Sequence, residues 1–260
     1  MKGAIIGDVV GSIYEWHNIK TKEFPLFQRR STFTDDTVMT CAVAKAFLEA
    51  AKYDAPIVEH MTRSMQELGR KNPHRGYGGR FGRWIYDENP QPYNSLGNGA
   101  AMRASPAGFL GKTVEDAYEL GELTAMPTHD HPEGLKAAGV TAALIWLAHH
   151  GADKDELYRY ASNQYAIPNL DTIRPTYQFD VTCMGTMPVA LAAFFESDSF
   201  EDAIRNAISV GGDSDTIGAI TGSIAEAYYG VPEEIWQEAR SRLSDELAEI
   251  VDEFYAHRWE

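Results

Sequence analysis

The sequence is poor in cysteine and in basic residues, and each shortage excludes a class of protein. Only two cysteines occur in 260 residues, Cys41 and Cys183, and neither has the spacing of a zinc-binding motif. We therefore expect both to be small buried thiols in a reducing compartment. Lysine and arginine number 23 against 38 acidic residues, which gives a formal net charge of -15. Because nucleic-acid affinity depends on basic side chains that displace counterions, bulk binding of DNA or RNA is not expected.

Long hydrophobic runs and strand-like alternation are also missing. No stretch approaches the roughly 18 apolar residues of a membrane-spanning helix, and Asp8 interrupts the apolar opening segment. These features predict a cytoplasmic protein that does not contact a membrane. Helical periodicity prevails along the chain, and 44% of its residues are hydrophobic. The sequence therefore predicts an all-α fold with a single domain over residues 1–260.

Several segments have the composition of particular helices or loops. Residues 35–53 and 134–150 are apolar on most sides and predict buried helices. Residues 215–229 are rich in glycine and alanine, which let neighbouring helices approach closely. The acidic residues 232–255 predict a solvated closing helix, and the Pro- and Gly-rich residues 71–106 predict an irregular region.

One acidic pattern occurs near both ends of the chain, as Thr34-Asp35-Asp36-Thr37 and as Gly212-Asp213-Ser214-Asp215-Thr216. Each pattern places two carboxylates and a hydroxyl at the start of a predicted helix. Oxygen ligands of this kind suit Mg²⁺ or Mn²⁺, so the two segments predict two halves of one binuclear centre. The structural alternative is helix capping, for which Ser, Thr and Asp are preferred. Capping needs only one acceptor per helix, and paired carboxylates repel one another, so the metal interpretation is favoured.

The loops carry further candidate ligand contacts. Gly97 and Gly99 flank Asn98 and can present backbone N–H groups to a phosphate, although the same residues are common in turns. His129 and His131 alternate in one short segment, but a zinc site needs further ligands that the sequence does not offer. We expect one histidine to contact a ligand and the other to cap the next helix. Aromatic side chains are candidates for stacking on a base, with a place in the core as the alternative for each: Tyr77, Phe81, Trp84, Tyr177 and Phe179.

Together these motifs resemble the ADP-ribosylglycohydrolase family, which includes dinitrogenase-reductase-activating glycohydrolase and the ADP-ribosyl-acceptor hydrolases. The resemblance covers almost the whole chain and is specific because the motifs occur in the family's order. The matching segments are Gly3-Ala4-Ile5-Ile6-Gly7-Asp8-Val9-Val10-Gly11-Ser12 with Glu15, then Phe33-Thr34-Asp35-Asp36-Thr37, Gly97-Asn98-Gly99-Ala100-Ala101-Met102-Arg103, Thr128-His129 and Gly211-Gly212-Asp213-Ser214-Asp215-Thr216-Ile217-Gly218.

The resemblance implies a compact orthogonal helical bundle with two Mg²⁺ or Mn²⁺ ions at the bottom of an ADP-ribose cleft. It implies metal ligands, substrate contacts and catalytic candidates, with Tyr177 as the expected adenine-stacking residue. The implied metal ligands are Thr34, Asp35, Asp36, Asp213, Asp215 and Thr216; the implied substrate contacts are Ser95, Gly97, Asn98, Gly99, His129 and Tyr177; the catalytic candidates are Asp35, Asp36, Asp213 and Glu15.

The predicted function is metal-assisted hydrolysis of the glycosidic bond between ADP-ribose and an acceptor on a protein or small molecule. An arginine-type acceptor is favoured because its cationic guanidinium suits a strongly acidic protein. Two alternatives remain at this stage: a non-catalytic ADP-ribose-binding protein, and a binuclear phosphohydrolase acting on a nucleotide. A monomer is the default expectation.

Overall fold

Helices make up the regular structure of the chain. The computed structural model describes residues 1–53 and 55–258, and within them no strand extends beyond an isolated bridge between Gly97 and Thr182. The predicted all-α fold is therefore confirmed. The helices are α1 Lys2–Gly11, α2 Asp35–Ala50, α3 Ile57–Lys71, α4 Gly79–Trp84, α5 Gly99–Met102, α6 Ser105–Gly108, α7 Val114–Ala125, α8 Pro132–His149, α9 Lys154–Ser162, α10 Leu170–Ile173, α11 Cys183–Phe195, α12 Phe200–Ser209, α13 Ser214–Tyr229, α14 Glu233–Arg240 and α15 Asp245–Ala256.

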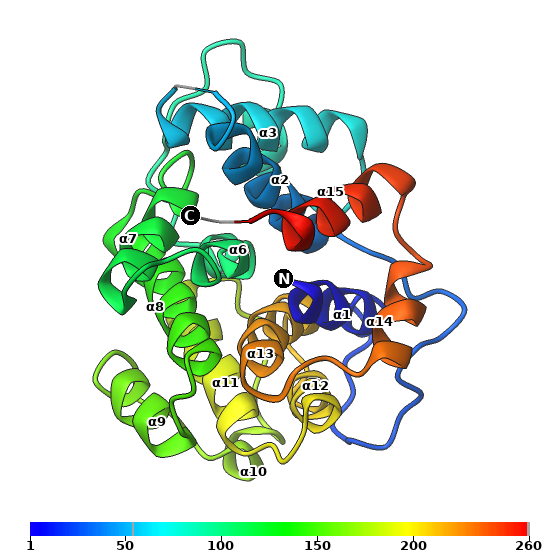
Figure 1. The fold of residues 1–260 in the computed structure, drawn as a ribbon. Coiled ribbons are helices and arrows are strands. Elements are labelled where there is room, and N and C mark those ends of the chain that lie inside the picture. Colours follow the sequence, from blue (N-terminus) through cyan, green and yellow to red (C-terminus); the bar gives the residue numbers. More distant parts are fainter. Residues whose placement is uncertain (54, 259–260) are drawn as a thin grey trace.

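The central feature of the fold is the close antiparallel contact between α1 and α13, which lie side by side in the middle of the molecule (Figure 1). Glycines on both helices make this contact possible. A Cβ atom added at Gly7 would lie 2.0 Å from the carbonyl oxygen of Gly218, and one at Gly3 would lie 2.0 Å from that of Gly222. At the end of α1, a Cβ atom on Gly11 would lie 2.4 Å from the Cα atom of Asp215. The contact therefore fixes the first turn of α13 against the last turn of α1.

A carboxylate on α1 also fixes the start of α2. Asp8 is fully buried and accepts hydrogen bonds from the backbone N–H groups of Thr34, at 2.9 Å, and of Thr37, at 3.0 Å. The hydroxyls of Thr34 and Thr37 also donate to Asp8. The first N–H groups of a helix have no partner within the helix, so Asp8 satisfies them from a neighbouring element. Through these contacts α1 holds the N-terminal turns of α2 and α13 close together.

The remaining helices surround this centre with one continuous apolar core. α8 and α11 pack beside α13, and α2 packs against α3 and α15 (Figure 1). Cys41 and Cys183 are both buried and free, as expected for small apolar thiols. No helix in the described ranges is both long and apolar enough to cross a membrane.

Two expectations about segments differ from the structure. Residues 232–255 form two helices, α14 and α15, because Ser244 caps a new helix by accepting a hydrogen bond from the N–H of Leu247. Both helices bury an apolar face that includes Trp236 and Phe254, so the segment is amphipathic and not simply solvated. The expected irregular region 71–106 contains the short helices α4 and α5 and the start of α6.

Candidate active site

A cavity of about 430 Å³ opens where the N-terminal turns of α2 and α13 meet the loops around residues 76–80, 93–99 and 179–181. Its volume lies within the range of small-molecule sites. One part of the wall is acidic, and another part carries cationic or neutral hydrogen-bond donors. The acidic side chains are Glu15, Asp35, Asp36, Asp213 and Asp215; the donors include Arg80, Asn98, Arg103 and His129.

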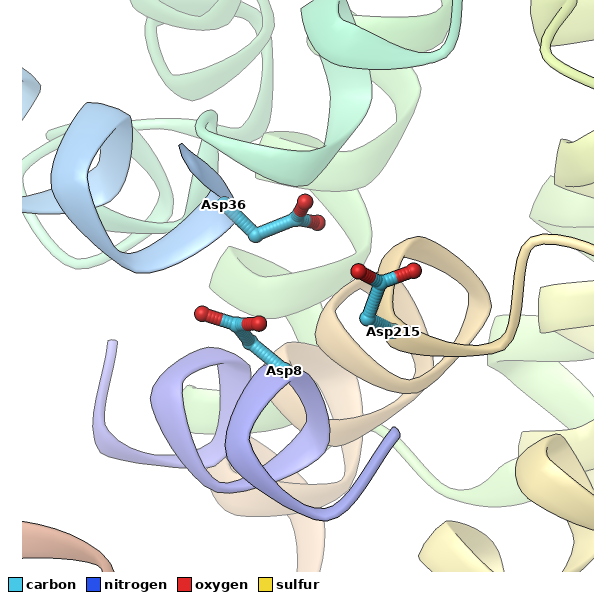
Figure 2. Close-up of side chains that lie close together, drawn as sticks. All are labelled: Asp8, Asp36 and Asp215. Atoms are coloured by element: carbon cyan, nitrogen blue, oxygen red, sulfur yellow. The ribbon is translucent and has the colours of Figure 1, made fainter. Parts of the chain in front are cut away.

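Three buried carboxylates converge below this cavity. Figure 2 shows Asp8, Asp36 and Asp215 pointing toward one another from α1, α2 and α13. One carboxylate oxygen from each lies within 4.8 Å of the others. A second group under the same limit joins Glu15, Asp213 and Asp215. Asp215 belongs to both groups, so the two acidic patterns of the sequence meet in one cluster.

The turn before α13 directs Asp213 and Asp215 into this cluster. Gly211 and Gly212 have φ angles of 71° and 73°, a left-handed conformation that glycine adopts without a steric penalty. Asn18 holds the turn through a 2.8 Å hydrogen bond from the N–H of Gly212 and a 2.9 Å hydrogen bond to its carbonyl oxygen. Asp213 occupies the N-cap position of α13, but its side chain makes no capping hydrogen bond. Helix capping therefore does not account for the carboxylate of Asp213.

Neutral side chains donate hydrogen bonds to two carboxylates of the cluster. The hydroxyl of Thr216 donates to an oxygen of Asp36 at 3.3 Å, and the side-chain amide of Asn98 donates to an oxygen of Asp213 at 2.7 Å. The other oxygen of Asp36, Oδ1, is buried and has no hydrogen-bond partner in the described part of the chain. An ionised oxygen without a partner is costly inside a protein, so Oδ1 requires a proton or a cation.

The pKa values of the clustered carboxylates are raised. Burial is the main cause: it raises the pKa of Asp36 and Asp215 well above the usual range, and repulsion from neighbouring carboxylates adds to the effect. Burial and repulsion from Asp213 raise the pKa of Glu15 to about 7. Without a counter-charge, this cluster opposes its own full ionisation.

These residues fit a divalent cation. All the converging groups offer hard oxygen donors, the two carboxylate groups share Asp215, and Asp36 Oδ1 has no hydrogen-bond partner among the described residues. Mg²⁺ and Mn²⁺ prefer oxygen donors of this kind, and a positive charge would relieve the mutual repulsion of the carboxylates. The chemistry of the donor set thus agrees with a site for divalent cations.

Only some of the metal-ligand candidates from the sequence belong to the converging carboxylate groups. Asp36, Asp213 and Asp215 belong to the converging groups, and the hydroxyl of Thr216 contacts Asp36. Asp35 lines the same cavity but lies outside the two converging groups. Thr34 caps α2 and donates its hydroxyl to Asp8. The ligand roles assigned to these residues from the sequence stay predictions.

The expected substrate contacts lie mostly together. Ser95, Gly97, Asn98, Gly99 and His129 all line the cavity. His131 instead caps α8 by accepting a hydrogen bond from the N–H of Glu133 at 3.1 Å, as expected for one of the two histidines.

Tyr177 takes a different position. Its ring packs on the backbone of Gly212, where an added Cβ atom would lie 2.5 Å from the ring, and its hydroxyl donates to the carbonyl oxygen of Gly185 at 3.1 Å. Tyr177 therefore supports the turn before α13 and is not among the described residues that line the cavity. Its assignment as the adenine-stacking residue stays a prediction that this position does not favour.

Sequence reasoning missed three residues at or beside the site. Asp8 was visible as the single acid within an apolar helix, a pattern that indicates a buried carboxylate with a partner. Trp16 is 74% exposed and stacks at the cavity on Phe179, one of the aromatic candidates from the sequence, with ring centroids 5.3 Å apart. Arg103 is 1% exposed and lines the cavity wall. No sequence signal distinguished Trp16 and Arg103 from surface or core residues of the same types.

An all-α fold that gathers buried carboxylates from three helices at one cavity defines a candidate hydrolase. Comparison with known proteins agrees with this class. The sequence model of the ADP-ribosylglycohydrolase family matches residues 1–260, so the chain belongs to that family and is a hydrolase.

Similar proteins span most of the chain. ADP-ribosylhydrolase ARH3 of Homo sapiens is 26% identical over 92% of this chain and 87% of its own length. ADP-ribosylarginine hydrolase Tri1 of Pseudomonas putida is 27% identical over 98% of this chain and 79% of its own. ADP-ribosyl-[dinitrogen reductase] glycohydrolase of Rhodospirillum rubrum is 27% identical over 88% of this chain and 84% of its own. A solved structure titled as an ADP-ribosylglycohydrolase-related protein complex superposes with a TM-score of 0.72, 25% identity and coverage of 98% and 94%.

Proposed function

We propose that this protein hydrolyses the glycosidic bond between ADP-ribose and an acceptor, using two divalent cations held by the buried carboxylates. The observation that carries the proposal is the pair of carboxylate groups that share Asp215 at the cavity, with Asp36 Oδ1 lacking a hydrogen-bond partner in the described part of the chain. Membership of the ADP-ribosylglycohydrolase family and the names of the similar hydrolases support the substrate class.

Cleavage at the anomeric carbon of ribose passes through a transition state of oxocarbenium character. Bound divalent cations would supply a water of lowered pKa and polarise the oxygens they contact. Asp36, Asp213 and Asp215 are the residues that would hold these cations. Asn98 orients Asp213 by donating to one of its oxygens. Glu15 belongs to one carboxylate group only and is less buried than Asp36, Asp213 and Asp215, which supports its assignment as the carboxylate that holds or moves a proton.

Another part of the cavity wall suits a diphosphate. Arg80 lies over the ring of Tyr93, with its Cζ atom 4.5 Å from the ring centroid, and both residues line the cavity. Gly97 and Gly99 expose backbone close to His129 on the same wall. A cationic side chain and an open backbone loop are typical partners of phosphate oxygens. An ADP-ribose molecule with its ribose at the carboxylates would direct its diphosphate toward this wall.

An arginine-type acceptor is the favoured leaving group. Trp16 directly follows Glu15 at the cavity, and its indole is exposed. A guanidinium group stacks well on an indole face and is attracted by a nearby carboxylate. The two relatives named for arginine or dinitrogen reductase are about as similar to this chain as ARH3 is, so identity alone does not choose the acceptor.

Product analysis tests the proposal. Purified protein is incubated with ADP-ribosylated arginine, ADP-ribosylated serine and O-acetyl-ADP-ribose, with Mg²⁺ or with a chelator, and the products are identified by mass. Release of intact ADP-ribose only in the presence of the cation is the expected result. Free phosphate or AMP would favour a nucleotide phosphohydrolase, and tight ADP-ribose binding without turnover of any substrate would favour a binding protein.

A further inference from the structure

A buried guanidinium forms part of the cavity wall. The side chain of Arg103 is 1% exposed, and in the described part of the chain no carboxylate forms an ion pair with it. Its N–H groups donate to the carbonyl oxygens of Thr124, at 3.1 Å, and of Ala125, at 3.4 Å, and to the hydroxyl oxygen of Thr128, at 2.8 Å. Because a buried charge without a counter-ion is costly, this arrangement calls for a specific explanation.

The hydrogen bonds around Thr128 favour one direction. Its hydroxyl oxygen lies 2.8 Å from a nitrogen of Arg103 and 2.7 Å from Nδ1 of His129. A guanidinium can only donate, so the oxygen of Thr128 accepts from Arg103, and its own hydrogen is available to His129. Arg103 itself also places a nitrogen 3.4 Å from the same Nδ1 atom. A proton on Nδ1 would face this N–H group of Arg103, so the geometry favours an unprotonated Nδ1 that accepts from the hydroxyl of Thr128.

The other ring nitrogen faces the cavity. Burial, and then the nearby charge of Arg103, lower the pKa of His129 well below its usual range, so the ring is neutral and its hydrogen is on Nε2. A Cβ atom added at Gly99 would lie 3.2 Å from Nε2, and one at Gly97 would lie 3.4 Å away. Both glycines line the cavity, and among the described residues Nε2 has no hydrogen-bond partner.

We propose that Arg103 is a positioning residue that acts through the hydroxyl of Thr128 to hold His129 in its Nε2–H tautomer, as a fixed neutral donor to an oxygen of the bound ligand. The identity of that ligand, an ADP-ribose group, rests on the proposed function. The tautomer of His129 does not rest on the proposed function, because it follows from hydrogen bonds within the chain. Arg103 therefore contributes a buried positive charge that organises the ligand wall.

The tautomer is read directly by NMR of the full-length protein labelled with ¹⁵N-histidine. The signals of His129 are assigned from their absence in His129→Asn. The expected result is a protonated Nε2 and an unprotonated Nδ1 in the wild-type protein. A wild-type ring protonated on Nδ1, or on both nitrogens, overturns the proposal.

Two variants of Thr128 test how the tautomer is fixed. Thr128→Val removes the donor hydroxyl at nearly constant shape, and Thr128→Ser keeps it as the matched control. We expect Thr128→Val to populate the Nδ1–H tautomer and to raise the Kd for ADP-ribose, measured calorimetrically with Mg²⁺, about 2- to 10-fold, the loss expected for one hydrogen bond. Thr128→Ser retains the wild-type tautomer and Kd. Retention of the full wild-type tautomer in folded Thr128→Val overturns the proposal, whatever its affinity.

The same data separate this inference from the proposed function. A wild-type protein with the Nε2–H tautomer that neither binds nor releases ADP-ribose contradicts the proposed function alone. A wild-type protein that cleaves ADP-ribosyl substrates with a different tautomer contradicts the role of Arg103 alone.

Discussion

At the scale of single residues, the site depends on carboxylates that are placed where they repel one another. Asp36 and Asp215 are only 2% and 3% exposed, and one carboxylate oxygen of each lies within 4.8 Å of one from Asp8. Their raised pKa values show that ionising them opposes folding when no cation is present. Residues that oppose folding in this way are typical of functional sites.

Asp36→Asn tests this balance. We expect kcat/KM for the cleaved ADP-ribosyl substrate to fall about a thousandfold or more, because a ligand charge is lost at the cation site. In chelator, the melting temperature of the variant should equal or exceed that of the wild type, since a repelling charge has been removed. Activity assays and thermal melts measure both effects.

The matched control for that variant is Asp155→Asn, which removes an equal charge from an exposed position of α9. It should retain wild-type activity and stability. Near-full activity in folded Asp36→Asn would show that this carboxylate is not required for turnover.

A second prediction at this scale concerns Trp16 and the choice of acceptor. Trp16→Ala should raise KM for an ADP-ribosylated arginine substrate about 2- to 5-fold, the value of an exposed cation–π contact. KM for O-acetyl-ADP-ribose should change less, because the acetyl group of that substrate carries no positive charge. Trp16→Phe retains an aromatic face and serves as the control. An equal rise in KM for both substrates would assign Trp16 to the shared ADP-ribose group and not to the acceptor.

At the scale of helices, the contact between α1 and α13 brings the site together. Both helices use glycine at spacings of four residues, and the contact ends where Gly11 meets Asp215. Asp8, one turn before Gly11, then accepts the N–H groups that begin α2. Three helices from distant parts of the sequence thus bring their polar groups to one place. The close approach of α1 and α13 is possible because glycines stand where larger side chains would separate these two helices.

Gly7→Ala tests the close contact. The new methyl group would overlap the carbonyl of Gly218, which is backbone and has little freedom to move, so we expect destabilisation of about 1–3 kcal/mol or more. Chemical denaturation measures the free energy of unfolding. The control is Gly82→Ala in α4, where the nearest atom to an added Cβ lies 3.9 Å away.

In an exposed helix, alanine is favoured over glycine by about 0.5–1 kcal/mol, so Gly82→Ala should be neutral or stabilising. Equal effects of the two substitutions would mean that the helices can separate at little cost and that the site does not depend on their close approach.

At the scale of the whole molecule, the net charge of -15 adds to the local repulsion within the site. A ligand that binds only the folded protein stabilises it, by about 2.7 kcal/mol at a free concentration of one hundred times its Kd. Divalent cations therefore have two routes to stabilise this protein, by binding the site and by screening the surface.

Cation removal distinguishes stabilisation by binding at the site from stabilisation by screening of the surface charge. Mg²⁺ or Mn²⁺ should raise the melting temperature of the wild type, and excess chelator should reverse the rise. NaCl at matched ionic strength screens the surface charge and should give a smaller increase. Asp36→Asn should respond to Mg²⁺ and NaCl alike. A wild-type protein that also shows no difference between the two salts would contradict a specific cation site.

The sequence by itself determined the fold class and most of the acidic residues of the site. Helical periodicity sufficed for an all-α fold, because each amphipathic or apolar segment reports its own local burial. The two acidic patterns were sufficient to predict that distant segments meet, because paired carboxylates at a helix start exceed what capping requires. The order of the motifs along the chain was sufficient to indicate the family.

Only the tertiary structure decided which of these residues meet, and which others join them. Asp35 directly precedes Asp36 in sequence, yet it lies outside the converging groups, because a helix start directs successive side chains to different sides. Thr34, one residue earlier, donates its hydroxyl to Asp8 of the same cluster. Asp8 and Arg103 took their roles from partners on other elements, Thr37 in one case and Thr128 in the other. Side-chain direction and long-range hydrogen bonds arise when helices pack, so they have no signature in the local sequence.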